Sequence, residues 1–512
     1  MGFIKKYRLE ILASIIIALL YFFLRLIYLT RLPIFTDEAI YLRWAQIALH
    51  DSAWRFISLT DGKQPLFVWV AMIFMKFIKD PLLAGRLVSV LSGFFTMAGI
   101  WLLTLELFKN RKTAFLTTTL YVFYVFAQVY DRMALMDGMV GTFAVWALYF
   151  SILLVRKVRL DVSYSLGFII GAGVLTKTSD FFSIYLLPFT VILFDFKSKF
   201  LKQRFIRWVI LAIFAVLVSQ FFYSVLRLSP LFQMIQTKNA IFVYPFAEWF
   251  NHPFTFFIGN IHGLFSWLIS YLTLPYILLI VFSFIFINKF TKEKLLLFLY
   301  FSLPFVALAL FGRIIFPRFI YFMSLFLLPL AGWSLNFIID FLEDKLKLNK
   351  LSYLRYPVNF LIIAAFVFYP AYVSFGFAVN PVTAAIADSD SNQYVNNWSA
   401  GWGVKESVAF FNEQAKNGKI FIATEGTFGL MPETMEMYLI QNPNVKIKGY
   451  WPIENMLPKE ALDYAKKMPS FFIFYQPQHI VIPSDFPLKL LFQVKEGSSN
   501  YLYRVYQILP QK

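Results

Sequence analysis

Two adjacent acidic residues, Asp37 and Glu38, follow the first long apolar run of the chain, residues 11–29. A run of this length can cross a bilayer, because a transmembrane helix needs about 20 apolar residues. Basic residues precede the run, which predicts a cytoplasmic N-terminus and places the acidic pair at the outer lipid–water boundary. Adjacent carboxylates lose hydration there and repel each other, so they are kept more readily for chemistry than for stability. The alternative interpretation is a solvated loop that happens to begin with two acids.

Three further polar segments are expected on the same side of the membrane. They are Asp61–Pro65 before the second run, Asp131–Asp137 between the third and fourth runs, and Arg313 with Arg318 between the ninth and tenth. A carboxylate can accept the proton of an acceptor hydroxyl, and Lys or Arg can bind a departing phosphate. Together these groups favour an enzyme that acts on a phosphorylated lipid. Taken singly, each segment also has a structural interpretation as a helix start or a headgroup anchor.

The composition indicates the elements that must position these residues. Hydrophobic residues make up 59% of the chain and charged residues 15%, whereas about 25% of a soluble domain is charged. We therefore expect a multi-pass α-helical membrane protein with about eleven transmembrane helices. The expected spans are residues 11–29, 82–107, 113–130, 139–155, 163–176, 181–195, 208–227, 264–287, 295–311, 319–339 and 357–377.

The net charge of +18 is distributed in a pattern typical of membrane topology. Basic residues gather in every second loop, which predicts that these loops lie in the cytoplasm with the N-terminus. An odd number of spans then places the C-terminus outside the cytoplasm. The pattern matches anionic headgroups and argues against nucleic acid as a partner. The absence of cysteine excludes disulfides, thiolate metal sites and a cysteine nucleophile.

Three outer segments follow from this topology. The loop 30–81 contains an amphipathic stretch, Asp37–Leu49, that can lie as a helix in the interface plane. The loop 228–263 is aromatic, and we interpret its two histidines, His252 and His262, as interfacial residues, because the one pair Glu248 and His252 has too few ligands for a metal site. Residues 1–377 are thus expected to form a transmembrane domain, and residues 378–512 a small extracytoplasmic α/β domain. Its expected strands are Lys419–Thr424, Ser470–Tyr475 and Tyr501–Tyr506, and its expected helices Val404–Lys416 and Lys459–Lys467.

Several short motifs occur along the first two thirds of the chain. They are Phe35–Tyr41, Gly62–Phe67 and Arg132–Asp137, with weaker matches at Gly171–Lys177 and Phe316–Phe319. In this order and orientation, residues 1–340 resemble polytopic glycosyltransferases of the GT-C fold. They are most similar to prokaryotic members of the protein O-mannosyltransferase and lipid A aminoarabinose transferase group.

This resemblance implies transfer of a sugar, with inversion, from a polyprenyl-phosphate donor to an acceptor on a protein, a lipid or a glycan. It implies that Asp37 is the general base, with Glu38 beside it, and that Asp137 is the acid of the second outer loop. Donor-phosphate contacts are expected from Lys63, Arg132 and Arg318. The chain departs from the family pattern at Gly62, Gln64 and Phe319, so the sequence does not support a divalent metal, which stays an open alternative, and the cofactors are unassigned.

Alternative functions remain open at this stage. A transporter or lipid flippase would need charged residues in mid-membrane and broken helices in paired positions, whereas the expected spans are nearly free of charge at their centres. A glycan polymerase or ligase would use the same type of donor. A scaffold that binds a partner through its tail would not explain why acids and cations gather at one face.

Overall fold

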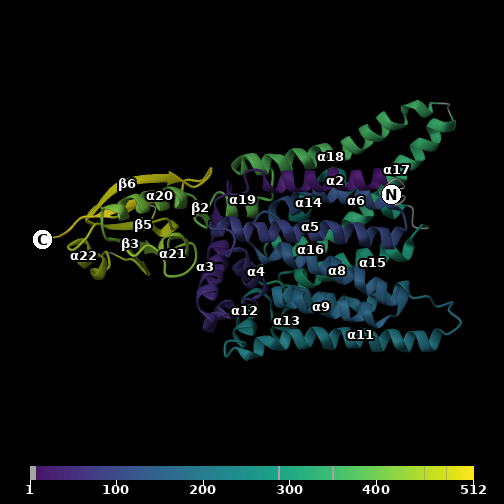
Figure 1. Cartoon of the computed structure of the whole chain (residues 1–512), viewed down its shortest axis with the longest axis horizontal. Coiled ribbons are helices and arrows are strands. Elements are labelled where there is room, and N and C mark those ends of the chain that lie inside the picture. Colours follow the sequence, from purple (N-terminus) through teal and green to yellow (C-terminus); the bar gives the residue numbers. More distant parts are fainter. Residues whose placement is uncertain (1–6, 286–288, 349–350, 455, 480, 512) are drawn as a thin grey trace.

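A bundle of long apolar helices carries a small sheet domain at one end (Figure 1). The computed structural model describes residues 7–285, 289–348, 351–454, 456–479 and 481–511. Eight helical segments of this described chain are long and apolar enough to cross a membrane. They are α2 (Arg8–Leu26), α5 (Pro81–Phe108), α8 (Met136–Lys157), α11 with the turn after it (Leu201–Leu228), α14 (Phe257–Ile285), α15 (Thr291–Phe311), α16 and α17 (Arg318–Leu348), and α18 with the turn before it (Ser352–Val379). The expectation of a multi-pass helical membrane protein is confirmed.

The other three expected spans are shorter or broken. Residues 113–130 form two helices, α6 (Arg111–Val122) and α7 (Val125–Tyr130), because Tyr124 adopts an extended conformation between them. Residues 163–176 lie in the 17-residue helix α9 (Leu160–Thr176). Residues 181–195 fall in a series of short helices that includes α10 (Phe182–Leu186) and a 3₁₀ segment with Pro188 near its start. The count of about eleven spans is therefore not reproduced by the long helices.

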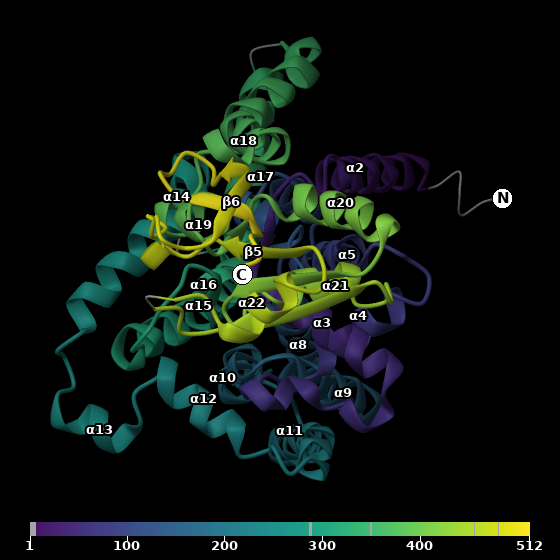
Figure 2. The same ribbon diagram turned by 90° about the vertical axis from the view of Figure 1, so that its left-hand side faces the viewer.

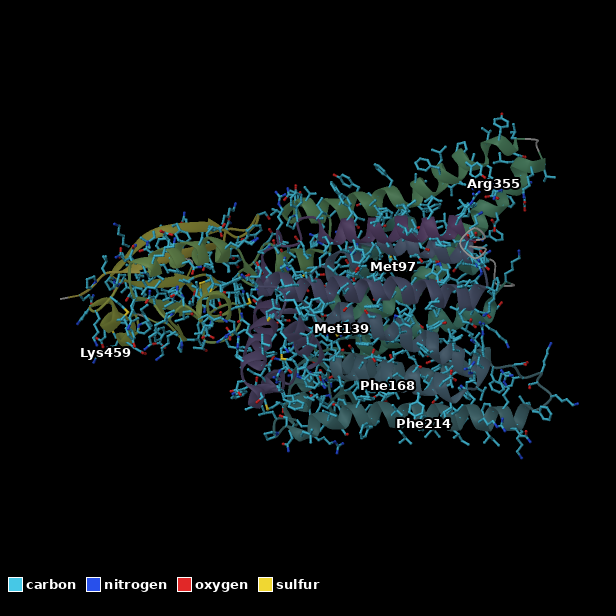
Figure 3. The ribbon with its side chains drawn as sticks, viewed as in Figure 1. Met97, Met139, Phe168, Phe214, Arg355 and Lys459 are labelled. Carbon is cyan, nitrogen blue, oxygen red and sulfur yellow. The ribbon has the colours of Figure 1, made fainter. Side chains whose placement is uncertain are left out.

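Salt bridges join the loops at the end of the bundle that carries the N-terminus. Glu10 of α2 pairs with Arg111 at 3.4 Å, and Arg156 pairs with Glu106 at 2.8 Å and with Glu293 at 3.2 Å. Figure 3 shows Arg355 at this end and Lys459 of the sheet domain at the opposite extreme of the molecule. The basic loops that were expected to share one side are thus held together at one end.

Shorter helices cover the end of the bundle that faces the sheet domain. They are α3 (Thr36–His50), α4 (Leu66–Phe74), α12 (Met234–Phe242) and α13 (Phe246–Asn251). Helix α3 runs across the long helices (Figure 1), as the amphipathic pattern of residues 37–49 predicts. Both faces of α3 are largely covered, and Leu42, Trp44 and Ala45 are buried. The helix is therefore a layer between the bundle and the sheet domain.

The residues after α18, here called the tail, fold around a five-stranded sheet. Its strands are β3 (Ile420–Glu425), β4 (Val445–Tyr450), β5 (Ser470–Phe474), β6 (Leu488–Lys495) and β7 (Leu502–Ile508), in the order β4-β3-β5-β7-β6. Its helices are α19 (Asp388–Tyr394), α20 (Val404–Gln414), α21 (Glu433–Leu439) and α22 (Lys459–Ala465). Strands β3, β4 and β5 are parallel. The three expected strands and two expected helices are present, whereas β4, β6, α19 and α21 were not expected.

A short antiparallel pair joins the tail to the first inter-helix segment of the bundle. Strand β1 (Ile34–Phe35) pairs with β2 (Ala400–Gly401), and the Thr36 N–H donates to the Ser399 carbonyl at 3.1 Å. A Cβ atom at Gly401 would lie 2.7 Å from the Ile34 carbonyl oxygen, so this close approach requires glycine. Further along, Arg43 forms a 2.9 Å ion pair with Glu436 of α21. The tail is thus attached to the segment that leads into Asp37.

Candidate active site

A cavity of about 410 Å³ lies among helix ends on the tail side of the bundle. Its lining comes from the residues just before α4, the start of α8, the segment from Lys177 to Tyr185, the end of α12, the end of α15 and the start of α16. The apolar wall includes Phe181, Phe182, Phe242, Phe311, Phe319 and Phe322. Four cationic side chains also line it, namely Lys63, Lys177, Lys238 and Arg318. The cavity therefore combines an aromatic wall with a concentration of positive charge.

The tail does not cover the whole of this end of the bundle. Figure 2 looks along the bundle from the tail side and shows α11, α12 and α13 outside the outline of the sheet domain. Tyr185 and Val243, which belong to the cavity lining, are 63% and 42% exposed. Exposed apolar side chains on a membrane-spanning bundle face lipid. The cavity thus reaches the surface where the bundle is apolar and uncovered.

Asp37 reaches the edge of the cavity through Arg318. Its Oδ2 accepts a hydrogen bond from Nη1 of Arg318 at 2.7 Å, and the two side chains are 19% and 8% exposed. Asp37 lies in the first turn of α3, where a carboxylate is favoured by the helix dipole. Burial alone would raise the pKa of Asp37, but the charges of Arg318 and Lys63 outweigh it and hold this pKa below its ordinary value. Asp37 is therefore ionised at neutral pH.

Lys63 faces the cavity without a counter-charge in contact. Its Nζ lies 5.9 Å from the ring centroids of both Tyr41 and Phe242, and within the described chain it has no hydrogen-bond or ion-pair partner. Burial lowers the pKa of Lys63 to about 8, although Asp37 opposes the shift. A half-buried ammonium group with free donors is a site for an anion.

Gly62 explains how Lys63 is presented and why no ligand side chain precedes it. Gly62 has φ +63°, and a Cβ atom there would lie 2.3 Å from the Met234 carbonyl oxygen. A side chain is therefore excluded at this position by conformation and by space. The packing of α12 against this loop thus requires glycine at residue 62, where the chain departs from the family pattern.

The other charged groups at the cavity form pairs. Asp137, in the first turn of α8, accepts a 2.6 Å hydrogen bond from Lys177. Lys238 forms a 2.6 Å ion pair with Asp61. Each of these lysines keeps donors that its carboxylate does not use, because an ammonium group has three.

Glu38 lies on a different face of α3, away from the cavity lining. It is fully buried, and its carboxylate accepts two hydrogen bonds from Arg86, at 2.9 and 2.7 Å, one from the Phe35 N–H at 3.0 Å and one from the Ala134 N–H at 2.6 Å. The bond to Phe35 closes the first turn of α3. Four donors saturate this carboxylate, which leaves it no free lone pair for a substrate.

Arg132 is also outside the cavity lining. It is 2% exposed and donates to the carbonyl oxygens of Leu24 and Arg25, at 2.8 and 2.9 Å, and of Tyr28 at 3.1 Å. These carbonyls belong to the end of α2 and the turn after it, where a helix lacks internal donors. Of the six site residues expected from the sequence, the structure thus brings together Asp37, Asp137, Lys63 and Arg318, and it gives Glu38 and Arg132 protein partners elsewhere.

Two lysines at the cavity were not among the expected site residues. Lys177 ends the segment Gly171–Lys177, which the sequence marked only as a weak match, so its signal was present but was not used. Lys238 lies in α12, within the aromatic segment 228–263, and no local pattern sets it apart from a loop lysine. Its place in the cavity lining is seen only in the tertiary structure.

The acids at the cavity do not form a ready metal site. Among the residues that the structure describes, no group of three or more His, Asp and Glu side chains is placed to hold a metal ion. Asp37 and Asp137 are each engaged by a cationic side chain. The donor set as arranged therefore does not fit a divalent cation.

Comparisons with known proteins agree with the resemblance seen in the sequence. Residues 62–223 match the family described as dolichyl-phosphate-mannose-protein mannosyltransferase. The structure of ArnT from Cupriavidus metallidurans in the apo state aligns over 99% of this chain and 100% of its own, with 11% identity and a TM-score of 0.59. The same protein bound to undecaprenyl phosphate aligns over the same shares, with 12% identity and a TM-score of 0.56.

An archaeal enzyme shares the architecture in part. The oligosaccharyltransferase AglB from Archaeoglobus fulgidus, in complex with an inhibitory peptide and a dolichol-phosphate, aligns over 86% of this chain with 15% identity and a TM-score of 0.56. The present chain covers 65% of the length of that enzyme. No curated protein matches the chain in sequence. The chain has the GT-C fold, and the fold class expected from the sequence is confirmed.

Proposed function

We propose that this chain is a glycosyltransferase that moves a sugar from a polyprenyl-phosphate donor to an acceptor hydroxyl. The proposal rests on the cavity. Its lining includes the ammonium group of Lys63, which has no counter-charge in contact, and an aromatic wall that reaches the uncovered surface of the bundle. A phosphate ester on a prenyl chain has the complementary chemistry, namely an anion joined to a long apolar group. Structures of similar fold with undecaprenyl phosphate and with dolichol-phosphate support this class of donor.

In the proposed reaction, Lys63 and Arg318 contact the donor phosphate. The acceptor oxygen forms a bond to the anomeric carbon from the face opposite the phosphate, and the bond from that carbon to the phosphate oxygen breaks with inversion. Polyprenyl phosphate leaves with the bonding electrons, so its negative charge grows during transfer. Cations placed at this oxygen therefore stabilise the transition state more than the bound donor.

Asp37 is the proposed acceptor of the hydroxyl proton. In the structure its carboxylate is paired with Arg318 at 2.7 Å, which makes it a weak base. A donor phosphate that binds Arg318 shares the guanidinium and neutralises part of its charge, so the basicity of Asp37 rises when the donor is bound. The pairing of base and phosphate ligand thus favours proton removal in the loaded enzyme.

The remaining expected site residues are proposed to position the others. Asp137 holds Lys177 beside the ring of Phe319, whose centroid is 4.8 Å from the lysine Nζ. Glu38, through Arg86, fixes the first turn of α3 and hence the direction of Asp37. Arg132 fixes the end of α2. These contacts support the proposal that the three residues do not touch the donor phosphate.

A transport function has less support from the arrangement of charge. Buried ion pairs of the bundle lie near helix ends, as with Arg25 in the last turn of α2, 3.1 Å from Asp131, and Arg86 in the second turn of α5, 2.7 Å from Glu38. Both are pairs between protein groups. Ion-coupled transport would need titratable groups that face a pathway through the middle of the membrane.

A donor assay tests the proposal directly. Purified protein in detergent is incubated with labelled polyprenyl-phosphate sugars, and release of free polyprenyl phosphate is measured. We expect Lys63→Met and Arg318→Met to lower kcat and to weaken donor binding. Arg313→Met is the matched control, because Arg313 is exposed and lies over the ring of Tyr244 at 5.4 Å, outside the cavity lining. Normal turnover by both cavity variants, or loss of activity in the control variant alone, would contradict the assignment.

The proposed orientation has a separate test. We propose that the N-terminus is cytoplasmic and that the tail lies outside the cytoplasm, at the plasma membrane, on the argument of the basic loops. The chain has no cysteine, so a thiol reagent can label only the single cysteine that a substitution introduces. In intact cells an impermeant thiol reagent should label Ser484→Cys, at an exposed position of the tail, but not Ser198→Cys, in the basic segment before α11. The reverse pattern would overturn the orientation.

A further inference from the structure

A carboxylate of the tail is buried against two helices of the bundle. Asp390, in α19, has no exposed surface, and its Oδ2 accepts hydrogen bonds from the hydroxyl of Tyr130 at 2.6 Å and from the hydroxyl of Tyr271. Tyr130 belongs to α7 and Tyr271 to α14. One side chain of the tail therefore fastens two separate helices of the bundle.

These phenols belong to a buried group of rings that contacts segments of the proposed active site. The ring of Tyr394, also in α19, meets the ring of Phe35 edge to face at 4.8 Å, and its hydroxyl lies 3.3 Å from that of Tyr130. The ring of Tyr130 in turn lies 5.5 Å from that of Tyr321, one turn after Arg318 in α16. Contacts thus run from Asp390 to the two segments that carry Asp37 and Arg318.

The same stretch of the tail also holds the backbone that leads into Asp37. Phe35 pairs with Ala400 in the β1–β2 ladder, and both the N–H and the hydroxyl of Thr36 donate to the Ser399 carbonyl at 3.1 Å. Asp37 is the next residue. Its carboxylate direction is therefore set from one side by Arg318 and from the other by residues 399–401 of the tail.

On this geometry we propose that Asp390 is a positioning residue of the active site, through which the tail sets the geometry of Asp37 and Arg318 for sugar transfer. The inference rests on the proposed function but assigns a role to a part of the chain that lies outside the cavity. Asp390 does not touch the donor. It acts through Tyr130 and Tyr394 on the segment 35–37 and on α16.

The charge state of Asp390 suggests the variants to use. Burial raises the pKa of Asp390 to about 7, against the hydrogen bonds of Tyr130 and Tyr271 and the charge of Arg318, while Asp137 adds to the rise. The site therefore accepts a neutral group near neutral pH. Asn keeps one oxygen that can accept from both phenols. Ala removes the acceptor of both buried hydroxyl groups and leaves Tyr130 only the more distant hydroxyl of Tyr394, at 3.3 Å.

The test compares Asp390→Ala, Asp390→Asn and a control on the same helix. Asp388→Ala removes the same type of side chain at an exposed position of α19 and should leave kcat unchanged. We expect Asp390→Ala to lower kcat about 10- to 100-fold, the scale of a small misplacement of reacting groups, and Asp390→Asn to restore it to within about threefold of that of the wild type. In Asp390→Ala, binding of undecaprenyl phosphate, measured by calorimetry, should weaken far less than kcat falls, because Lys63 is untouched and a displaced Arg318 costs more in the transition state than in the bound donor. In Asp390→Asn and Asp388→Ala, this binding should stay unchanged.

The possible results separate this inference from the proposed function. Failure of the wild-type protein to turn over any polyprenyl-phosphate sugar, with either an undecaprenyl or a dolichyl carrier, would contradict the proposed function. A normal kcat in Asp390→Ala would overturn the positioning role, and so would an equal loss of kcat and of phosphate binding, since that marks general damage to the fold. If Asp390→Ala does not fold, Tyr394→Leu tests the positioning role instead. It keeps Asp390 and its two phenols but removes the ring against Phe35, and its kcat should fall while Tyr394→Phe remains active.

Discussion

Asp37 and Glu38 are neighbours in sequence, yet their surroundings differ in almost every respect. Asp37 is partly exposed, has one cationic partner, and reaches a cavity through Arg318. Glu38 is fully buried, has four hydrogen-bond donors and holds Arg86. Successive residues of a helix point about 100° apart, so one turn of α3 directs one acid to Arg318 of the cavity lining and the other to the protein interior. The comparison separates an acid available for chemistry from an acid that builds the site.

Substitution of Asp37 should have the largest effect on the rate. Asp37→Asn keeps the size of the side chain and removes its basicity. We expect kcat to fall about 100- to 10,000-fold, the usual contribution of a general base, while the thermal midpoint of unfolding changes little. Steady-state assays with a labelled donor measure the first quantity and thermal melts in detergent the second. Turnover close to that of the wild type, at normal expression, would remove Asp37 from the mechanism.

Substitution of Glu38 should instead act on stability. Glu38→Gln leaves the buried guanidinium of Arg86 without a counter-charge, and removal of one partner of a buried ion pair costs about 3 to 5 kcal/mol. We expect a clear drop in the thermal midpoint and in the yield of folded protein, with kcat of the surviving folded fraction reduced less than in Asp37→Asn. The double variant with Arg86→Met should recover part of the stability. A stable Glu38→Gln protein with abolished turnover would reverse the roles of the two acids.

The pH dependence should report on Lys63, whose charge interacts with that of Asp37. Burial lowers the pKa of Lys63 to about 8. Below this pH the ammonium group is charged and can bind the donor phosphate, and above it the charge is lost. We therefore expect kcat/KM, which reflects the free enzyme, to decline as the pH rises above about 8. In Lys63→Arg the decline should disappear from the accessible range, because a guanidinium stays protonated there. An unchanged alkaline limb in that variant would assign the decline to another group.

Asp137 should give the smallest of these effects. Its carboxylate holds Lys177 at 2.6 Å and has no direct contact with Asp37 or Arg318 among the described residues. We expect Asp137→Asn to lower kcat several-fold at most and to leave the thermal midpoint close to that of the wild type. Lys177→Met, measured beside it, shows whether the pair acts through its lysine. A loss in Asp137→Asn as large as that in Asp37→Asn would make Asp137 a second acid–base group.

Much of the candidate site could be predicted, because the membrane topology predicts which loops lie at the same end of the bundle. Lys63, Asp137 and Arg318 are far apart in sequence, but helix parity brings their segments to the same end of the bundle. The topology does not predict the rotation of each helix about its own axis. Nothing local distinguishes Asp37 from Glu38, since the face of α3 that meets the cavity is set by packing against α5 and α21. Lys238 could not be predicted for the same reason, because its contact with Asp61 is formed only by tertiary folding.

In the tail, two of the three predicted strands contain continuous apolar runs. Strands β3 and β5 are buried on both faces, and their segments Ile420–Ala423 and Phe471–Phe474 are uninterrupted apolar sequence. Strand β4, at the sheet edge, alternates instead, with Val445 buried beside the exposed Lys446, and this period of two was a usable signal that was missed. Strand β6 carries a register shift between Leu490 and Phe492, which breaks the alternation and hides the strand from a pattern search.

The contact between Thr36 and Ser399 spans 363 positions of the chain, and this has a consequence for biogenesis. At roughly 5 to 20 residues per second, the ribosome needs about 20 to 70 s to make the intervening segment. During that time β1 has no strand to pair with, and the start of α3 is without its cover. The site can therefore assemble only after the tail, the last quarter of the polypeptide, has been synthesised and has folded. A chain that terminates early, even with every helix of the bundle in place, is expected to be inserted in the membrane and inactive.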